Sequence, residues 1–508
     1  MNAMQPRVAV IIAAPDRPGS PLQITTRLAT QLMPALRSLC HVDEYRDTDL
    51  DDQTAAILLR RHDVIIGFSQ FVLRQRQALK VPCPVLLPAD GLAGKGYRSL
   101  CRLDGQLAEG DGFFCSSTAA LLNLTTHLRT NAWQAHFLPS PLSVGEPALQ
   151  RNDVQPSTGQ TDLLYVGKLK PQNNIHLLLH CLAELRSRGR DCRLILQETA
   201  PTIDTLEGHW KSLTYGTHLQ ALALELGVRP YIDIRPTAKM DPSAVLDKRT
   251  IHVNLSTSLA NTCDFTAADA AALGIPTVAT AWGPHLDTVR HGVSGFHVPV
   301  CSFNRGPLVD ERAAVDLLDA LLSPERHQRL SRAARNWAQQ YSADVFRSRL
   351  KFILDQLCSQ RTASLRLVRS HEILSPAVGR HYALLQSAGQ QTWPLAQDWP
   401  FPAPEFAQAF SYGYLLPHYN AWSLSSRPHR VTGVQLSGGD ASVEWPPYTY
   451  RVSLDRPLQH LLHAIDGRQS VQQLASLLDV CGRELLLQLA TLARLGLVIP
   501  HHPLGALP

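Results

Sequence analysis

The chain has 508 residues, which is too long for a single hydrophobic core, so two or three domains are expected. Its 48 Lys and Arg residues nearly balance its 43 Asp and Glu residues. No dense basic run with interleaved aromatic residues occurs, and the composition therefore argues against nucleic acid as a partner.

The cysteines and the N-terminus indicate the compartment. Ten cysteines are scattered without a C-x-x-C pair, several of them inside apolar segments. This pattern is typical of reduced, buried thiols in a cytoplasmic protein rather than of a disulfide framework or a zinc site. The apolar run at 8–14 is too short for a signal peptide or a membrane-spanning helix, so we expect a buried first strand and no transmembrane segment.

The first 150 residues alternate short apolar runs with segments of helical period. This alternation predicts a Rossmann-like domain over 1–150 with a parallel sheet. The predicted strands are 7–14, 63–69, 84–90, 112–117 and 135–142. The polar, turn-rich stretch 143–160 is interpreted as the linker to the next domain.

The same alternation restarts after the linker and predicts a second doubly wound α/β domain over 151–360. A helical run from about 311 to 358 closes this domain. The predicted strands are 161–169, 193–198, 231–236, 251–256 and 276–281.

The last part of the chain contains two segments that differ in composition and hydrophobic pattern. Residues 361–444 form a connecting segment rich in proline and aromatic residues, including Trp393, Trp399 and Trp422, which favours irregular packed structure over a tether. Residues 445–508 return to helical periodicity, with three short predicted helices and a strand-like LGLVI. We interpret them as a small, mostly α, winged-helix-like module.

Several local sequences resemble one family over roughly residues 5–360. AHFLPSPLSV is similar to the family's "PNP(V/I)D" ending of the first domain, LLYVGKLKPQNN to its "YVGRL-x-x-x-KG" entry, and GIPTV to its "G-x-P-V-V". With two α/β domains and a long closing helix, the chain resembles retaining, family 4-like glycosyltransferases of the GT-B fold. The resemblance implies transfer of a sugar from a nucleotide-diphosphate donor, with the acceptor bound in the cleft facing the first domain.

The resemblance also implies a donor site. Lys168, after Gly167, stands at the family's arginine facing the diphosphate, and Asn173 stands at its lysine. Counting back from GIPTV places Asp269 at the second glutamate of the family's E-x7-E, which binds ribose, and Asn261 at the first, near the donor sugar. A cation is needed where the leaving diphosphate gains negative charge.

Further donor contacts follow from the same comparison. The helix that begins near Thr266 would offer backbone N–H groups to the diphosphate. Gly283 and Asp287 stand at the family's glycine turn and acidic residue. The implied catalytic residues are Lys168 and Asn261, and no metal or other cofactor is expected beside the donor. The implied donor-binding residues are Gly167, Lys168, Asn173, Thr266, Asp269, Gly283 and Asp287.

Structural interpretations compete with these roles. Thr266 and Asp269 also fit a capping box, and a lysine at the end of a strand is commonly solvated. His176 and His180 are spaced i, i+4, but without a third ligand we expect a helix surface rather than a metal pair. His285 and His291 are expected to be exposed and not catalytic.

The terminal module resembles small PqqD-like domains, which bind a leader peptide by strand addition; an ordinary packing domain is the alternative. We therefore predict a cytoplasmic, hexosyltransferase-like enzyme that transfers a sugar from a nucleotide-sugar donor to a glycan, peptide or small molecule. We expect no nucleic-acid partner. The alternative is a non-catalytic GT-B protein that recruits a peptide or protein through its C-terminal module.

Overall fold

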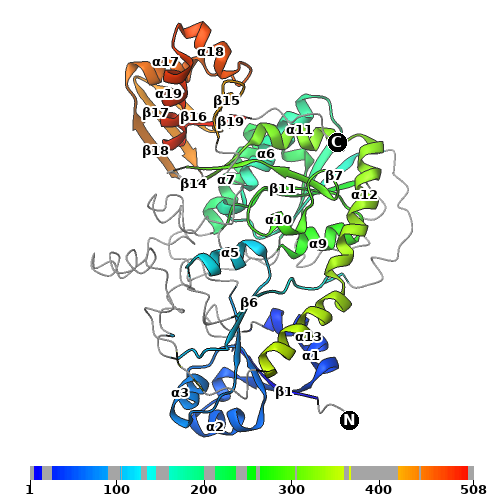
Figure 1. Cartoon of the computed structure of the whole chain (residues 1–508). Coiled ribbons are helices and arrows are strands. Elements are labelled where there is room, and N and C mark those ends of the chain that lie inside the picture. The colour runs from blue at the N-terminus through cyan, green and yellow to red at the C-terminus, as the bar shows by residue number, and fades with distance from the viewer. Residues whose placement is uncertain are drawn as a thin grey trace. The chain divides into compact units, whose positions relative to one another are not determined.

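The computed structural model (Figure 1) describes residues 5–13, 24, 26–89, 103, 106–127, 134–144, 159–198, 212–235, 249–258, 264–303, 306–359, 365, 367, 421–445 and 448–501. The chain divides into two compact units. The first comprises Met1–Glu146 and Gln340–Leu395, and the second comprises Pro147–Gln339 and Ala396–Pro508. Each unit contains one parallel six-stranded sheet, which confirms the predicted pair of Rossmann-like domains.

The first unit is built on a sheet with the order β2-β1-β3-β4-β5-β6, in which all pairs are parallel. Its strands are β1 (Arg7–Ile12), β2 (His41–Arg46), β3 (Val64–Ile66), β4 (Val85–Pro88), β5 (Gly112–Cys115) and β6 (Gln134–Phe137). Its helices are α1 (Thr26–Leu39), α2 (Asp52–Arg61), α3 (Gln70–Leu79), α5 (Thr118–His127) and α13 (Ala343–Ser359).

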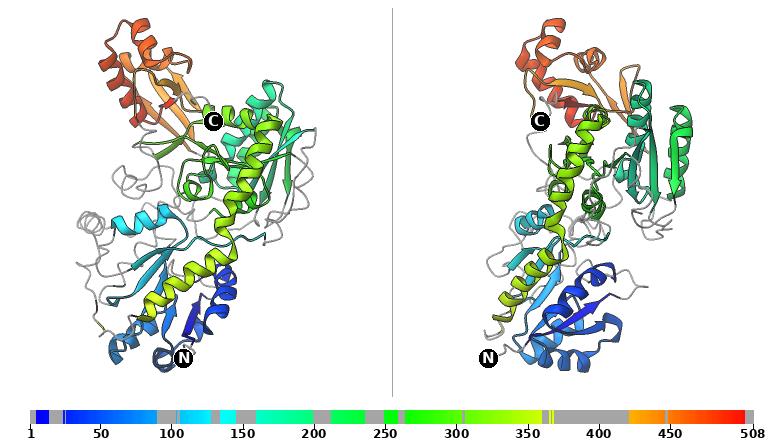
Figure 2. Two further views of the ribbon diagram at one scale, coloured as in Figure 1. Left: turned by 45° about the vertical axis from the view of Figure 1, so that its right-hand side comes forward. Right: turned by 90° about the vertical axis from the view of Figure 1, so that its right-hand side faces the viewer.

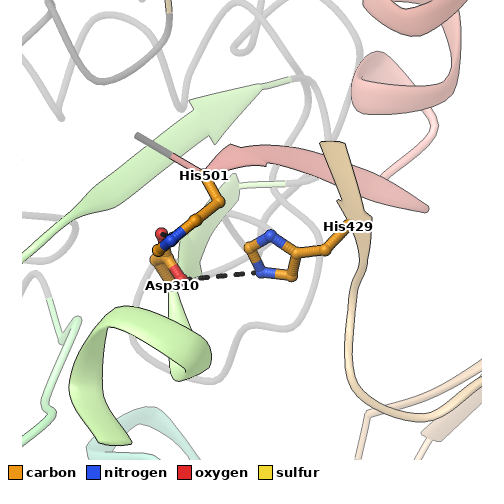
Figure 3. Close-up of side chains that lie close together, drawn as sticks. All are labelled: Asp310, His429 and His501. Atoms are coloured by element: carbon orange, nitrogen blue, oxygen red, sulfur yellow. Dashed lines mark hydrogen bonds and ion pairs between the residues drawn. The ribbon is translucent and has the colours of Figure 1, made fainter. Parts of the chain in front are cut away.

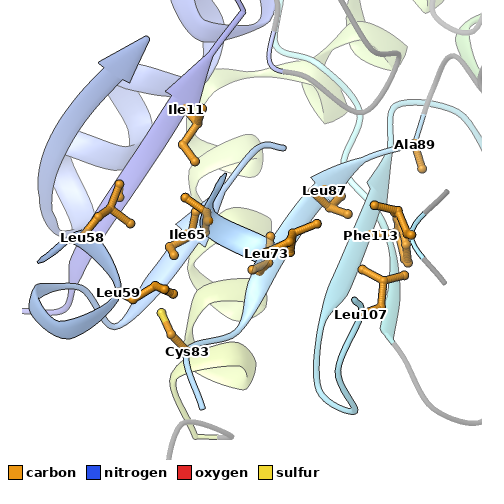
Figure 4. Packing of buried hydrophobic residues seen from close by; sticks show 14 of the residues in the cluster. Ile11, Leu58, Leu59, Ile65, Leu73, Cys83, Leu87, Ala89, Leu107 and Phe113 are labelled. Atoms are coloured by element: carbon orange, nitrogen blue, oxygen red, sulfur yellow. The ribbon is translucent and has the colours of Figure 1, made fainter. Parts of the chain in front are cut away.

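Both faces of this sheet are buried, because successive side chains of a strand point to opposite faces. Val8 and Val10 of β1 pack in a core with α1 and α13. Ala9 and Ile11 pack in a second core with α2, α3 and α5, part of which is shown in Figure 4. The apolar runs of the sequence are therefore strands covered on both sides, as a doubly wound fold requires.

Strand β2 has no counterpart among the predicted strands. Its sequence, HVDEYR, is mostly polar, and none of its residues is fully buried. It pairs only with β1, at the edge of the sheet, where one side remains open to solvent. An edge strand needs no continuous apolar run, which is why the search for such runs did not find it.

The second unit contains a parallel sheet with the order β12-β11-β10-β7-β8-β9 and helices beside it (Figure 2). Its strands are β7 (Thr161–Gly167), β8 (Cys192–Glu198), β9 (Ile232–Arg235), β10 (Thr250–Asn254), β11 (Thr277–Thr280) and β12 (Gly295–Val298). A hairpin follows, formed by β13 (Val300–Phe303) and β14 (Gly306–Val309). The helices are α6 (Ile175–Ser187), α7 (Ser212–Glu225), α9 (Phe265–Ala272), α10 (His285–Thr288), α11 (Glu311–Leu321) and α12 (Pro324–Ala338).

The predicted helical run from 311 to 358 consists of three helices, α11, α12 and α13. Ser323 accepts the Arg326 N–H and begins α12, and Pro324 occupies its first turn, where proline is tolerated. Helix α13 packs on α1 in the first unit, although the sequence analysis placed residues up to 360 in the second domain.

The described C-terminal residues form a small module with its own core. Its elements are β15 (Arg427–Arg430), β16 (Val434–Ser437), β17 (Asp440–Trp445), β18 (Tyr448–Ser453), α17 (Arg456–Ala464), α18 (Val471–Leu478), α19 (Gly482–Arg494) and β19 (Val498–His501). Leu461, Leu474 and Leu489 of the helices pack with Val443 of β17 and against Trp422. This packing therefore extends upstream of position 445; most of the aromatic segment 361–444 lies outside the described residues.

The structure bears on the expected lack of a transmembrane segment and on the state of the cysteines. Within the described segments, no helix combines the length and apolarity that a bilayer crossing needs. The described cysteines are free thiols, and most of them are buried.

Candidate functional site

The carboxyl ends of β7 and β10 mark a change of direction in the second sheet. The chain runs outward from β7 through β8 to β9 on one side and from β10 through β11 to β12 on the other. Open parallel sheets bind ligands in the crevice beyond such a switch point. Gly167, the last residue of β7, and Lys168, directly after the strand, were both predicted from the sequence and lie at this position.

The end of β7 is held by a tyrosine two residues before it. The Tyr165 hydroxyl donates a 2.8 Å hydrogen bond to the carbonyl oxygen of Lys168. A Cβ atom at Gly167 would lie 2.6 Å from that hydroxyl, so glycine is required for this close approach. The Lys168 side chain is exposed and makes no ion pair with any described residue. The backbone is thus fixed while the cation stays accessible.

The loop after Lys168 is tied to the loop after β10. Asn173 Nδ2 donates a 2.7 Å hydrogen bond to the Lys168 carbonyl, and Asn173 Oδ1 accepts one of 2.9 Å from Ser256. Asn174, the next residue, has a φ of 54° and donates to the Leu255 carbonyl. Asparagine is one of the few residues that adopts this left-handed conformation readily. The Asn173 amide therefore joins two loops of the site in this structure.

The start of α9 differs from the predicted capping box. The helix begins at Phe265, and Asp264 is its N-cap, accepting a 3.2 Å hydrogen bond from the Ala267 N–H. The Thr266 hydroxyl donates to the same carboxylate at 2.7 Å. The capping role predicted for Thr266 and Asp269 is therefore wrong, because an acidic residue two positions upstream supplies the cap. Asp269 lies buried in the helix.

Asp264 also lies against a buried histidine. His285 Nε2 lies 3.1 Å from Asp264 Oδ2, and its Nδ1 lies 2.8 Å from the Thr280 hydroxyl. Burial raises the pKa of Asp264, but the charge and hydrogen bond of His285 outweigh it and lower that pKa below its ordinary value. The expected exposure of His285 is wrong, because its side chain is completely buried.

One further bond connects these groups. The Thr280 hydroxyl donates a 2.6 Å hydrogen bond to the Ser256 carbonyl, and Ser256 bonds to Asn173. A continuous polar network therefore runs from the Lys168 loop through Ser256 and Thr280 to His285 and Asp264. A site whose dipoles are fixed before the ligand arrives can stabilise developing charge without reorganising.

Two of the remaining predicted donor-site residues follow β11, and one lies outside the residues that the structure describes. Gly283 has a φ of 56°, which suits glycine at the turn into α10, and Asp287 lies half-buried in α10. Asn261, the predicted second catalytic residue, lies outside the described residues. The structure thus connects Gly167, Lys168 and Asn173 directly; it links Thr266 to them through Asp264.

Comparison with known families identifies this part of the chain. Residues 148–337 match the family described as Glycosyl transferases group 1. Residues 148–337 are therefore similar to group 1 glycosyltransferases, and this segment is called the group 1 domain below. It contains every predicted donor-site residue from Gly167 to Asp287.

Solved structures show the same fold at low sequence identity. The crystal structure of a glycosyltransferase from Rickettsia africae is 11% identical, with a TM-score of 0.53, and the match covers 70% of this chain and 99% of that one. The structure of Anabaena Alr3699/HepE in complex with UDP and glucose is 13% identical, with a TM-score of 0.50, covering 69% of this chain and 99% of that one. Comparison with curated protein sequences found no match.

Asp264 and His285 of the group 1 domain were not among the site residues predicted from the sequence. An aspartate directly before a helical pattern is an N-cap signal that could have identified Asp264. His285 carried no such signal, since its pairing depends on bringing together segments that follow β10 and β11. Asp264 also places a negative charge at the helix end that was expected to receive a diphosphate.

His176, which was expected with His180 on a helix surface, has a structural role in the core. His176 is buried rather than on the helix surface, and its Nδ1 lies 3.0 Å from the Tyr215 hydroxyl. Its backbone N–H donates to the same oxygen at 3.1 Å. His176 therefore packs α6 against α7 in the core of the group 1 domain.

Buried histidines should make the group 1 domain sensitive to mild acid. Burial lowers the pKa of His176 to about 3 and those of His252 and His297 to about 4. Below the unfolded pKa of about 6.5, the unfolded chain binds more protons than the folded protein, so stability falls as pH falls. We expect the urea midpoint to decrease steadily from pH 7 to pH 5, and an unchanged midpoint would contradict this prediction.

Proposed function

We propose that the protein transfers a sugar from a nucleotide-diphosphate donor bound at the carboxyl ends of β7 and β10. The observation that carries this proposal is the accessible Lys168 ammonium beside a backbone fixed by Tyr165 and Asn173. When the bond between sugar and phosphate breaks, negative charge grows on the departing nucleoside diphosphate. A cation held at that point stabilises the charge and accelerates transfer.

The proposed chemistry needs few side chains. We expect the anomeric configuration to be retained, as the family 4-like resemblance implies, with the departing phosphate accepting the proton of the acceptor hydroxyl. No metal or other cofactor is assigned to this step. Asp269 is proposed to accept hydrogen bonds from the ribose hydroxyls, and Asn261 to contact the donor sugar.

The similar proteins suggest which donors to test first. The group 1 family match supports a nucleotide sugar, and the Anabaena structure contains UDP and glucose. A UDP-hexose is therefore the first candidate donor. For the acceptor we favour a peptide or protein recruited by the C-terminal module, in keeping with its PqqD-like resemblance.

A non-catalytic binding protein is the second candidate, and two features favour it. Asp264 places a carboxylate at the start of α9, where a diphosphate would meet it. The Asn173 amide, at the family's lysine, is engaged within the protein. Under this alternative the donor site is lost and the protein acts through its C-terminal module.

A donor screen separates the two functions. We expect one class among the UDP-, GDP- and ADP-sugars to raise the melting temperature in a concentration-dependent way, because a ligand that binds only the folded state stabilises it. Donor hydrolysis or transfer should then be measured with that nucleotide sugar. Absence of both binding and donor turnover would support the non-catalytic alternative.

Asp269→Asn tests the ribose contact in the same assay. Loss of the charged acceptor should weaken donor binding about 10-fold or more, because hydrogen bonds to charged groups contribute about 1.5–3 kcal/mol. Asp316→Asn, an exposed change in α11, is the matched control. If Asp269→Asn lowers the melting temperature of the unliganded protein while leaving donor affinity unchanged, the residue is structural.

A further inference from the structure

Three potential metal ligands that are not residues of the proposed donor site lie close together, as Figure 3 shows. They are Asp310, which lies between β14 and α11, His429 of β15 and His501 of β19. His501 Nδ1 lies 2.8 Å from Asp310 Oδ2, and His429 Nε2 lies 3.5 Å from Asp310 Oδ1. One ligand atom from each residue can be chosen so that all three lie within 4.8 Å of one another.

Strand pairing explains why the two histidines face the same carboxylate. Strands β15 and β19 are antiparallel, with His429 opposite Ile499. His501 is two residues beyond Ile499, so both imidazoles lie on the same face of the strand pair. Their ring centroids are 5.7 Å apart.

Helix α11 holds the carboxylate in place. Asp310 is its N-cap and accepts a 2.9 Å hydrogen bond from the Ala313 N–H. The Asp310 side chain is completely buried, and those of His501 and His429 are 8% and 13% exposed. Carboxylates that bind metals are commonly oriented by such a second hydrogen bond.

We propose that Asp310, His429 and His501 bind a divalent transition-metal ion, with Zn²⁺ as the best match. Two imidazole nitrogens and one carboxylate oxygen are a common zinc ligand set, and a water or another group completes the tetrahedron. The three residues lie within one compact unit, and none of them belongs to the proposed donor site.

The two histidines approach different oxygens of Asp310, and the His429 distance suits a shared ion whereas the His501 distance is that of an ordinary hydrogen bond. At metal–ligand distances of about 2.0–2.2 Å, two ligands of a tetrahedral zinc are about 3.3–3.5 Å apart. The 3.5 Å separation of His429 and Asp310 fits this value, whereas it is long for a hydrogen bond. The 2.8 Å contact of His501 would lengthen slightly as the ion replaces its shared proton, leaving that ring protonated on Nε2.

The ion would join two parts of the sequence. Asp310 belongs to the group 1 domain, and both histidines belong to the C-terminal module. Other contacts already connect these parts: Arg312 donates to the Gly467 carbonyl, and Thr432 donates to Glu311. A metal shared between them would fasten the module to the start of α11.

Metal binding to the full chain tests the proposal directly. After dialysis against a chelator, we expect wild-type protein to bind one equivalent of Zn²⁺ and to gain several degrees of melting temperature. Co²⁺ should give the visible absorption of a tetrahedral site, and Zn²⁺ should abolish it. No cobalt spectrum, or no uptake of one equivalent by wild-type protein, would overturn the proposal.

Substitution of each histidine tests whether it is a ligand of the metal ion. His429→Gln and His501→Gln should each weaken Zn²⁺ binding at least 10-fold, while His463→Gln, an exposed change on α17, should not. Equal affinity in all four proteins would show adventitious binding and overturn the assignment. If the ligand variants fail to fold, the wild-type cobalt spectrum and its stoichiometry decide the question.

Discussion

Replacing Asp264 by asparagine should lower the free energy of unfolding by about 1–3 kcal/mol, because a buried, charged hydrogen-bond acceptor is replaced by a neutral amide. Only 3% of the Asp264 side chain is exposed, and none of the His285 side chain. Asparagine has nearly the same size and can still accept the Ala267 N–H that begins α9. The substitution therefore removes the charge while retaining the cap. Urea unfolding of the full chain measures the effect.

An exposed ion pair supplies the control for this prediction. Asp191 contacts Arg186 at the surface of the same unit, and Asp191→Asn should change stability by less than about 0.5 kcal/mol. A similar small change for Asp264→Asn would show that the network around His285 tolerates a neutral residue. The interpretation of Asp264 as a charged partner would then be wrong.

Replacing Lys168 by alanine should reduce sugar transfer by about 100- to 1000-fold, the usual effect of removing a group that stabilises charge in the transition state. The folded structure should persist, because the side chain is exposed and the contacts of this residue that fix the loop are made by its carbonyl oxygen. Steady-state kinetics with the donor found in the screen should show the loss mainly in kcat. Circular dichroism should show an unchanged melting temperature for the unliganded protein.

Two further variants test whether transfer depends on a cation at position 168 or only on the net charge of this loop. Lys168→Arg keeps the positive charge, and its guanidinium can bind phosphate with two parallel hydrogen bonds, so activity should be kept. Lys170→Ala removes the same charge two residues away and should have a much smaller effect. Equal losses in Lys168→Ala and Lys170→Ala would indicate a diffuse electrostatic contribution instead of a specific contact.

The sequence predicted those strands and helices that a short stretch of hydrophobic pattern is enough to identify. Strands such as β7 and β10 are short apolar runs buried on both faces, and their order identified two parallel sheets. The edge strand β2 was missed because a half-exposed strand carries polar residues. Strands β16 and β17 were missed in the aromatic segment for a similar reason, since several of their residues are exposed.

Site residues were predictable only where one motif contained them. Gly167, Lys168 and Asn173 lie within seven residues of sequence and are joined in the structure. The pair Asp264–His285 and the cluster around Asp310 depend on contacts between distant segments, and His501 is 191 positions from Asp310. Hydrophobic periodicity and motif spacing in the sequence do not predict such contacts. The role of the Asn173 amide was likewise visible only once Ser256 was placed beside it.

Helix α13 has a consequence for synthesis on the ribosome. Leu350, Ile353 and Leu357 of this helix complete a core whose other members come from β1, α1 and neighbouring elements of the first unit. The ribosome makes the whole group 1 domain before it reaches α13. The first unit therefore cannot finish folding in N-to-C order, and its partly covered sheet must wait for residues made some 200 positions later. A chain released before α13 would expose that apolar face and be prone to aggregate.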